Sequence, residues 1–262
     1  MKDTKLFVVL PCYNEEEVLG ETSKRLLELY GKMISEGTVS PESKIVFVDD
    51  GSRDRTWEII SGLCEQNNIY RGVKLAHNAG HQNALLGGLM TVKDECDCAV
   101  SIDADLQDDI NVIPEMVKKF DNGCDVVYGV RSERKTDSFF KRTTAQGFYK
   151  FMAMMGVDVV YNHADYRLMS RRALNDLESF KEVNLFLRGL VPIGYKSDSV
   201  YYERAERFAG ESKYPLKKML SFAFDGITSF SVKPIKVLWS MGLIVCVAAV
   251  IAAIYTLVSK FF

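Results

Sequence analysis

The feature that most constrains this chain is an uncharged apolar run near its C-terminal end, VLWSMGLIVCVAAVIAAIYTLV, at residues 237–258. At about 1.5 Å of rise per residue, a helix of this length just spans a hydrocarbon core of roughly 30 Å. A buried core helix is the alternative, but a segment that is apolar on every face is more typical of a membrane span. Trp239 and Tyr255 lie near the two ends, where amphipathic rings prefer the interface. We therefore predict one transmembrane helix, which lies too far along the chain to be a signal peptide.

Lysines flank this run unequally, because Lys233 and Lys236 precede it and Lys260 follows it. The cytoplasmic ends of membrane helices carry an excess of Lys and Arg. The sequence also begins without the pattern of an export signal. We therefore expect a single-pass protein of the cell membrane with its N-terminal domain in the cytoplasm.

The composition of the whole chain narrows the class of that domain. With 47% hydrophobic residues among 262, the chain is not a disordered protein and is long enough for one large α/β domain. A mean hydropathy of −0.04 excludes a polytopic membrane protein. The net charge of −2 gives no reason to expect nucleic acid as a partner. The six cysteines include no CxxC pair and no nearby His, which predicts reduced thiols rather than a zinc site.

The domain alternates short apolar strands with helical segments, a pattern that predicts a mostly parallel sheet with helices on both faces. The predicted strands are 6–10, 44–48, 73–75, 98–102 and 125–128. Helices are predicted after Asn14 as N-cap, from about Thr56, and through residues 85–89. In sheets of this kind ligands bind beyond the carboxyl ends of the strands.

Polar side chains gather where these strands end: PCYNE at 11–15, DDGS at 49–52, Asn78, DAD at 103–105 and GVR at 129–131. Helix caps and turns explain any one of these, but acids at two ends and an arginine at another favour one shared ligand site. The charge pattern agrees, because residues 94–125 hold ten acids and two lysines, whereas residues 131–150 hold six basic residues and two acids. Such runs are usually solvated faces. An acidic stretch beside a basic one also suits a site that handles a cation and a phosphate.

The acidic stretch contains a DxD pair, Asp103 and Asp105. The chain has neither a GxxxxGK[ST] nor a GxGxxG motif, so a P-loop and a dinucleotide fingerprint are excluded. A phosphotransferase aspartate pair fits less well, because a second acidic pair already follows another strand. Two carboxylates one residue apart at a strand end hold Mg²⁺ or Mn²⁺ that also binds a diphosphate, and this is the prediction we favour.

The order and spacing of several motifs resemble the inverting glycosyltransferases of family 2, which have the GT-A fold. These motifs are LPCYNEEE, VDDGSRD, the Asn78-x-Gly80 turn and DADLQDD. Later segments resemble the polyprenyl-phosphate group, which contains the bactoprenol glucosyltransferases and dolichol-phosphate mannose synthases: GVRSERKTD, FFKRTTAQGFYK, HADYRLMSRRAL, NLFLRGL and RFAGESKYPLKKML. The resemblance runs from about Leu6 to the apolar run, and the absence of a QxxRW motif argues against a processive polysaccharide synthase. It implies an α/β, GT-A (Rossmann-like) domain.

The resemblance also implies which residues bind the donor and the metal. The donor set is Pro11, Tyr13, Glu15, Val48, Asp50, Asp103, Ala104, Asp105, Gln107, Arg131, Arg207 and Lys213. Within it, Asp50 is expected near the base or ribose. Asp103, Asp105 and Gln107 match the metal and diphosphate cluster, with Mg²⁺ or Mn²⁺ as cofactor.

Catalytic and acceptor roles are implied in the same way, with Asp165, Asp105 and Arg131 as the catalytic set. Arg131 would bridge the donor and acceptor phosphates, and Lys141 or Arg142 would bind the lipid phosphate together with it. Asp165 matches the acid that the family proposes as base. Because a lipid phosphate is already ionised near neutral pH, we expect this acid to position the acceptor or Arg167 more than to remove a proton.

The domain organisation is expected in three parts: a catalytic domain at 1–212, a juxtamembrane segment at 213–236 and the transmembrane helix at 237–258. The juxtamembrane segment places apolar residues at helical spacing beside two lysines: Leu216, Leu220, Phe224 and Ile227, with Lys217 and Lys218. This pattern favours an amphipathic helix on an anionic bilayer surface. A core-packing helix of the catalytic domain stays open as the alternative.

The expected activity is transfer of a hexose, glucose or N-acetylglucosamine, from a nucleotide sugar to polyprenyl (undecaprenyl) phosphate at the cytoplasmic membrane face. A UDP-sugar is favoured as the donor. The alternatives are a GDP-mannose-dependent mannosyltransferase, a tethered glycosyltransferase acting on a glycan or protein, and a regulatory module that binds nucleotide sugars. A homo-oligomer stays open.

Overall fold

A computed structural model of the chain describes residues 3–132, 163–179, 194–205 and 233–261. The chain divides into two compact units, which are described separately: Met1–Asp137 with Val160–Lys213, and Ser138–Val159 with Tyr214–Phe262. The first unit contains a sheet with helices on both faces, and the second contains the long helix α9 (Lys233–Phe261).

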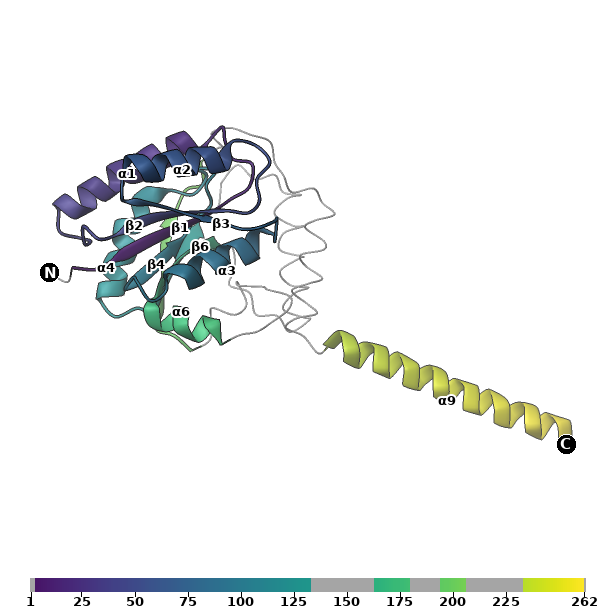
Figure 1. Ribbon diagram of the computed structural model, residues 1–262. Coiled ribbons are helices and arrows are strands. Elements are labelled where there is room, and N and C mark those ends of the chain that lie inside the picture. Colours follow the sequence, from purple (N-terminus) through teal and green to yellow (C-terminus); the bar gives the residue numbers. More distant parts are fainter. Residues whose placement is uncertain (1–2, 133–162, 180–193, 206–232, 262) are drawn as a thin grey trace. The chain divides into compact units, whose positions relative to one another are not determined.

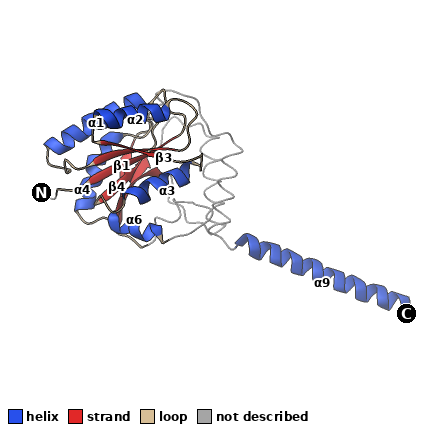
Figure 2. Cartoon of the chain, viewed as in Figure 1, coloured by secondary structure: helices blue, strands red, loops and turns tan. Residues whose placement is uncertain are grey.

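The first unit is built on a seven-stranded sheet (Figures 1 and 2). Its order is β3 (Tyr70–Lys74), β2 (Lys44–Asp49), β1 (Leu6–Cys12), β4 (Cys98–Ser101), β6 (His163–Ser170), β5 (Val126–Arg131) and β7 (Ser197–Tyr202). Among these strands only β6 runs antiparallel to its neighbours, β4 and β5. The predicted mostly parallel sheet is therefore confirmed.

Two layers of helices cover the sheet (Figure 1). One face carries α1 (Leu19–Ser35), α2 (Thr56–Gln66) and α4 (Ile113–Asp121), and the other carries α3 (His81–Val92) and α6 (Arg171–Glu178). On the first face a single buried cluster joins the three helices to the strands, with Tyr30 of α1, Ile60 of α2 and Met116 of α4 among its members. Burial of these apolar side chains is the main source of stability for the unit.

Helix α3 lies unusually close to the sheet because of one glycine. A Cβ atom added at Gly88 would lie 2.5 Å from Cγ2 of Val48 and 2.7 Å from Cγ1 of Val9. Only a residue without a side chain fits there. The close approach fixes α3 against β1 and β2, and its first turn is thereby placed beside the carboxyl ends of these strands.

Several local predictions need correction. Strand β1 continues through Pro11 to Cys12, and β3 begins at Tyr70 rather than Val73. Asn14 does not cap α1, which begins at Leu19 after Val18. The backbone of Asn14 has a φ of 53° and its polar groups bond to the loop after β2 instead. Strands β6 and β7 and helices α4 and α6 are additional to the elements that the sequence predicts.

Helix α9 confirms that the apolar run is helical, and it begins four residues before the predicted start. Its stretch Leu238–Phe261 is long and apolar enough to cross a membrane, with 24 residues and a mean hydropathy of 2.6. Trp239 and Tyr255 are exposed, as are the aliphatic side chains between them. The domain boundaries stay predictions, and the proposed amphipathic pattern at 216–227 lies outside the described residues.

Candidate functional site

The candidate site lies at the carboxyl ends of β1 and β4, where the strand order changes direction. Strands β1, β2 and β3 follow one another toward one edge of the sheet, while β4 lies on the other side of β1. Loops that leave such neighbouring strands diverge and create a binding crevice. Tyr13 and Glu15 of the predicted donor set follow β1 here, and the predicted metal residues Asp103, Asp105 and Gln107 follow β4.

The loops after β1 and β2 are fastened together by hydrogen bonds that involve backbone amides. The amide of Asn14 donates to Oγ of Ser52 at 3.0 Å, and the amide of Arg53 donates back to Oδ1 of Asn14 at 2.8 Å. The amide of Glu15 donates to Oγ1 of Thr56 at 2.9 Å. Both Tyr13 and Glu15 thus lie in a loop held beside the DDGS turn, and their part in a nucleoside pocket stays a prediction.

Asp50 holds a turn rather than facing open space. Its Oδ1 and Oδ2 accept hydrogen bonds from the amides of Ala79 at 2.7 Å and Gly80 at 3.1 Å. The side-chain amide of Asn78 donates to the carbonyl oxygen of Asp50 at 3.1 Å. Asp50 therefore connects β2 to the start of α3, and its expected contact with the base or ribose stays a prediction.

Two further predicted donor residues present no side chain to a ligand here. Val48 is fully buried and lies beneath Gly88 of α3, and Ala104 is 3% exposed. The hydroxyl of Thr22 donates to the carbonyl oxygen of Ala104 at 2.8 Å, which ties the loop after β4 to α1. Pro11 belongs to β1 and is buried. These buried residues therefore support the wall of the site from within the core.

The acid loop, DADLQDD at residues 103–109, follows β4. Its turn places Leu106 at a φ of 57°, and the amide of Gln107 donates to Oδ1 of Asp105 at 3.1 Å. Asp105 is 7% exposed. Poor hydration raises the pKa of Asp103 to about 6, and Asp108, Asp105 and Asp165 add to the shift while His81 opposes it. About a third of the Asp103 side chain still reaches solvent, so the crowding of acids lies at an accessible surface.

The donor set of the acid loop fits a divalent cation. Asp103 and Asp105 offer the carboxylate oxygens that Mg²⁺ and Mn²⁺ prefer, in a place where like charges raise the pKa of Asp103. Among the described residues no three His, Cys, Asp or Glu side chains gather as a metal cluster. Oxygens of a bound diphosphate could complete the coordination that Asp103 and Asp105 begin.

Asp165 is brought to this loop by β6 and is held from three sides. Its Oδ1 accepts from Nη2 of Arg167 at 2.7 Å, and its Oδ2 accepts from Nε2 of Gln82 at 3.0 Å. Nε2 of His81 lies 3.7 Å from Oδ2 of Asp165 and 3.6 Å from Oδ1 of Asp103. The predicted catalytic acid and the predicted metal ligand therefore share a histidine neighbour.

His81 and Gln82 are site residues that sequence reasoning missed. They open helix α3 directly after the Asn78-Ala79-Gly80 turn, which was itself recognised as a strand end. The signal was the position of the first helical turn after that strand end, since such a turn faces the crevice in a parallel α/β sheet.

Arg131 ends β5 and pairs with the acid loop. Its Nε and Nη2 lie 3.2 and 3.0 Å from Oδ1 of Asp108, and the hydroxyl of Tyr202 donates to the same oxygen at 2.6 Å. Burial disfavours the charge of Arg131, but Asp108 and Tyr202 outweigh it and raise the pKa of the guanidinium. Sequence reasoning predicted Arg131 and missed both partners, although Asp108 belongs to the DADLQDD motif.

A second arginine, Arg204, follows β7 and contacts the acid loop. Sequence reasoning missed it. Its Nη2 donates to Oε1 of Gln107, and the amide of Ala205 donates to the carbonyl oxygen of Gln107 at 2.9 Å. Burial and the nearby Arg131 lower the pKa of Arg204, while Asp108, Asp105 and Asp103 oppose the shift. The chain after β7 is thus anchored to the predicted metal loop. Four predicted residues, Lys141, Arg142, Arg207 and Lys213, lie outside the described residues.

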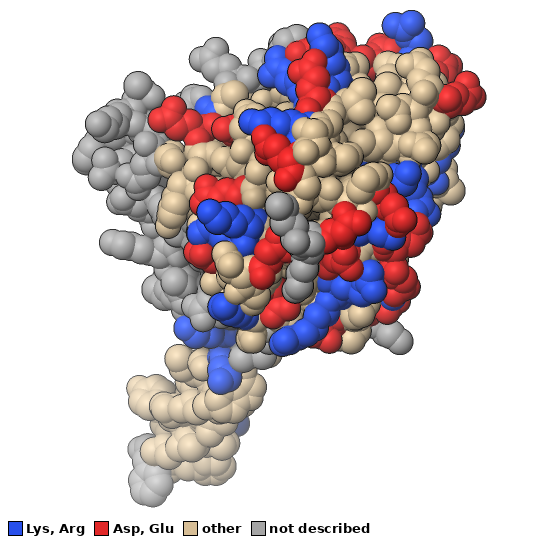
Figure 3. Space-filling model, turned by 90° about the vertical axis from the view of Figure 1, so that its left-hand side faces the viewer, with Lys and Arg blue, Asp and Glu red and all other residues tan. Residues whose placement is uncertain are grey.

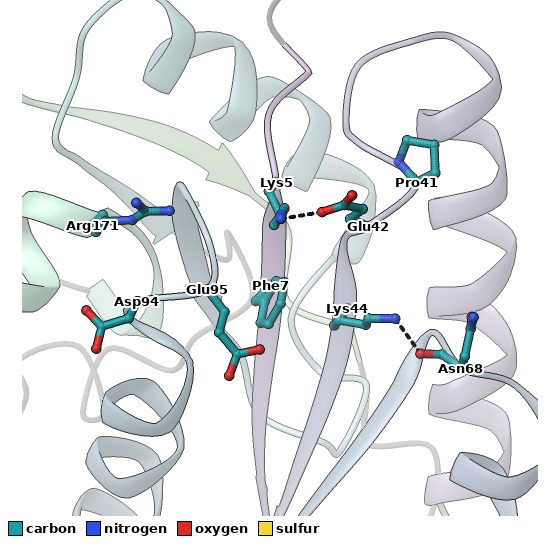
Figure 4. A pocket seen from close by; sticks show the side chains of 9 residues that line it. All are labelled: Lys5, Phe7, Pro41, Glu42, Lys44, Asn68, Asp94, Glu95 and Arg171. Carbon is teal, nitrogen blue, oxygen red and sulfur yellow. Dashed lines mark hydrogen bonds and ion pairs between the residues drawn. The ribbon is translucent and has the colours of Figure 1, made fainter.

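A hollow of about 540 Å³ lies away from this site, at the amino-terminal edge of the sheet (Figure 4). It is lined by Lys5, Phe7, Pro41, Glu42, Lys44, Asn68, Asp94, Glu95 and Arg171. Figure 4 shows Lys5 paired with Glu42 and the Lys44 ammonium group on the carbonyl oxygen of Asn68. Lys5 and Glu42 are paired with each other, and the ammonium group of Lys44 already donates to a carbonyl oxygen, so these side chains are engaged within the chain.

Comparisons with known proteins bear on the family and the fold of the chain. A family described as "Glycosyl transferase family 2" matches residues 7–178. The chain is 55% identical to the uncharacterized glycosyltransferase YkoT of Bacillus subtilis over 256 residues, covering 97% of this chain and 76% of that protein. It is 38% identical to the prophage bactoprenol glucosyl transferase homolog of Escherichia coli, covering 94% and 79%.

A solved structure has the same fold. Glucosyl-3-phosphoglycerate synthase from Mycobacterium tuberculosis, in complex with Mn²⁺, UDP and phosphoglyceric acid, superposes with a TM-score of 0.52 at 18% identity. The match covers 86% of this chain and 77% of that one. It confirms the expected GT-A arrangement of the α/β domain.

Proposed function

The chain belongs to glycosyl transferase family 2, and on this premise we propose that it transfers a hexose from a nucleotide sugar to a polyprenyl phosphate, with inversion at the anomeric carbon. The reaction would take place at the cytoplasmic face of the membrane. The observation that carries the proposal is the convergence of Asp103, Asp165 and His81 beside the acid loop. This convergence supports a site in which a cation held by Asp103 would lie close to Asp165.

The difficult step in such a transfer is departure of the nucleoside diphosphate, because negative charge develops on its phosphates. Asp103 and Asp105 would hold a divalent cation, which supplies electrostatic stabilisation of that charge when bound. Arg131, at the end of β5, would stabilise the same developing charge. Its guanidinium is already fixed in place before the donor binds. Charges that need no reorganisation at the moment of reaction contribute most to lowering the barrier.

The acceptor needs orientation more than deprotonation, because a phosphate monoester is already ionised near pH 7. Asp165 is suited to orientation, since its two oxygens are fixed by Arg167 and Gln82. The Asp165 side chain is 8% exposed, so little of its surface is accessible to a ligand. We therefore assign Asp165 to positioning the acceptor indirectly, by keeping Arg167 and Gln82 oriented, rather than to accepting a proton.

A lipid acceptor is supported by relatives and by helix α9. Several relatives are named as bactoprenol glucosyl transferases, among them a Shigella phage SfV protein 38% identical over 244 residues. The apolar stretch Leu238–Phe261 would hold the enzyme at the bilayer, where a polyprenyl phosphate presents its headgroup. Single-pass topology is part of this proposal.

The proposed sugar is glucose or N-acetylglucosamine, and the proposed nucleotide is UDP. The names of the relatives support glucose, and the solved neighbour was crystallised with UDP and Mn²⁺. GDP-mannose is the alternative donor.

The test incubates the full-length chain, in membranes or detergent, with undecaprenyl phosphate and a panel of radiolabelled UDP-glucose, UDP-N-acetylglucosamine and GDP-mannose. A labelled glycolipid in the organic extract with one UDP-sugar is expected. Label from GDP-mannose alone would correct the donor, and label only on a protein or glycan would overturn the lipid acceptor. Omission of divalent cation with added chelator is the matched control.

A further inference from the structure

The register of β7 against β5 places Tyr202 beside Arg131. The two residues are direct partners in the parallel pairing of β7 with β5. The amide of Ser132 also donates to the carbonyl oxygen of Tyr202 at 2.8 Å, so the pairing continues past the end of the strand. The contact between the phenol and the guanidinium is therefore set by the backbone.

Packing fixes the Tyr202 ring from behind. The ring lies edge-on to Tyr166, with 5.4 Å between the centroids, and the Tyr166 hydroxyl donates to the carbonyl oxygen of Asp109 at 3.0 Å. A Cβ atom at Gly129 would lie 2.7 Å from Cδ1 of Tyr166, so the Tyr166 ring has room only because residue 129 is glycine. The Tyr202 ring therefore packs on a side chain that is itself held in place.

Burial differs sharply among the three groups that meet at Oδ1 of Asp108. The side chain of Asp108 is 1% exposed and Tyr202 is 3% exposed, whereas 24% of the Arg131 side chain reaches the surface. A buried carboxylate requires bonding partners. A planar guanidinium that gives two N–H groups to one partner is fixed in orientation as well as in place. The buried pair therefore acts as an anchor, and the arginine is the part that a ligand can reach.

We propose that Asp108 and Tyr202 are positioning residues that hold the Arg131 guanidinium fixed toward the diphosphate of the departing nucleotide. The proposal rests on the proposed function, because it takes Arg131 as the group that meets the phosphates. Neither positioning residue touches the substrate. Since the orientation is established before the donor binds, its loss is expected in kcat more than in the donor KM.

The first test replaces Tyr202 by Phe, which removes the hydroxyl and keeps the ring that packs on Tyr166. We expect kcat to fall about tenfold, with the donor KM changed by less than about twofold. Two charge-assisted hydrogen bonds are lost, from the phenol to Oδ1 of Asp108 at 2.6 Å and from Nε of Arg131 to the phenol at 3.3 Å. Tyr201→Phe is the matched control, since Tyr201 is adjacent on β7 and 69% exposed, and it is expected to keep wild-type kinetics. Asp108→Asn is the second variant, to be used if Tyr202→Phe does not fold.

The second test is a double-mutant cycle in the R131K background, where the ammonium cannot form the planar fork. If Tyr202 acts through Arg131, Y202F costs less than about twofold there. The same tenfold loss in both backgrounds, or a loss confined to KM, would overturn the proposal and leave Tyr202 a general structural role. Transfer by the wild-type chain to an acceptor other than a lipid would overturn the proposed function alone, because the cycle can be measured on that reaction.

Discussion

The two edges of the sheet both carry many charges, but they hold them in different ways. At the amino-terminal edge the pairs are exposed and local, as for Arg71 with Glu95 at 36% and 52% side-chain exposure. Figure 3 shows this side of the molecule, with Lys and Arg interleaved with Asp and Glu. At the carboxyl-terminal edge Asp165 and Arg167 are paired at 8% and 1% exposure, and Asp108 is 1% exposed.

The difference identifies the functional edge more reliably than a hollow does. The hollow of Figure 4 lies at the amino-terminal edge, yet its ion pair of Lys5 with Glu42 lies at the exposed surface. Burying a charge is costly unless it is paired with good geometry, so a chain that keeps buried ions on several loops accepts a cost in stability at that place. Such a cost is typical of a site whose charges act on a ligand. Substitutions at the carboxyl-terminal edge should therefore change activity strongly, whereas substitutions at the amino-terminal edge should change it little.

The largest effect is expected from Asp105→Asn at the carboxyl-terminal edge. The substitution keeps the size of the side chain and the oxygen that accepts from Gln107, but removes the charge that would bind a cation. Sugar transfer should fall by about a thousandfold or more. Initial rates check this, with thermal unfolding as the control for folding. Near-normal turnover would contradict the metal assignment.

Asp165→Asn should reduce both stability and activity. It leaves the buried Arg167 guanidinium without its counter-charge, which typically costs about 3 kcal/mol or more. We expect kcat to fall about a hundredfold as well, because Arg167 and Gln82 lose the carboxylate that keeps them oriented for the acceptor. Chemical denaturation measures the first effect and single-turnover assays the second. Unchanged unfolding would show that Arg167 finds another partner.

Divalent cations should stabilise the folded chain, and more so at higher pH. The pKa of Asp103 is raised to about 6 from an ordinary 3.8, so without metal this group favours the fold below pH 4 and loses that contribution as the pH rises through 6. Protons and cations compete for the same carboxylate. Mn²⁺ should therefore raise Tm by several degrees at pH 7.5 and by much less at pH 5. Asp103→Asn should abolish this pH dependence, and equal shifts at both pH values in the wild type would contradict the assignment.

The smallest effect is expected from Glu42→Gln at the amino-terminal edge. Glu42 is 71% exposed and pairs with Lys5 at the surface, where ion pairs contribute little. Sugar transfer and Tm should both stay at the wild-type values, with Tm unchanged within about one degree. A marked loss of activity would mean that the hollow takes part in function.

Local patterns in the sequence predicted the first half of the sheet and the acids at its strand ends. Strands β1, β2 and β4 are apolar runs that stop close to a Pro or an Asp, which makes them easy to recognise. They did not predict β6 and β7, whose strands are recognised by long-range pairing rather than by a continuous apolar run. For the same reason Asp165 entered only through a family resemblance. Tyr202, Gln82 and His81 reach the site through register and helix placement, which no local pattern encodes. The Asn14 cap was wrong because polar groups of a neighbouring loop outcompeted the helix.

The reversed direction of β6 has a consequence for how this enzyme can vary. Strand β5 ends at Arg131 and β6 begins at His163, and both of these ends lie at the carboxyl-terminal edge. A connection between two strand ends at the same edge does not have to cross the sheet. Its length and sequence can therefore diverge between relatives without changing the pairing of any strand.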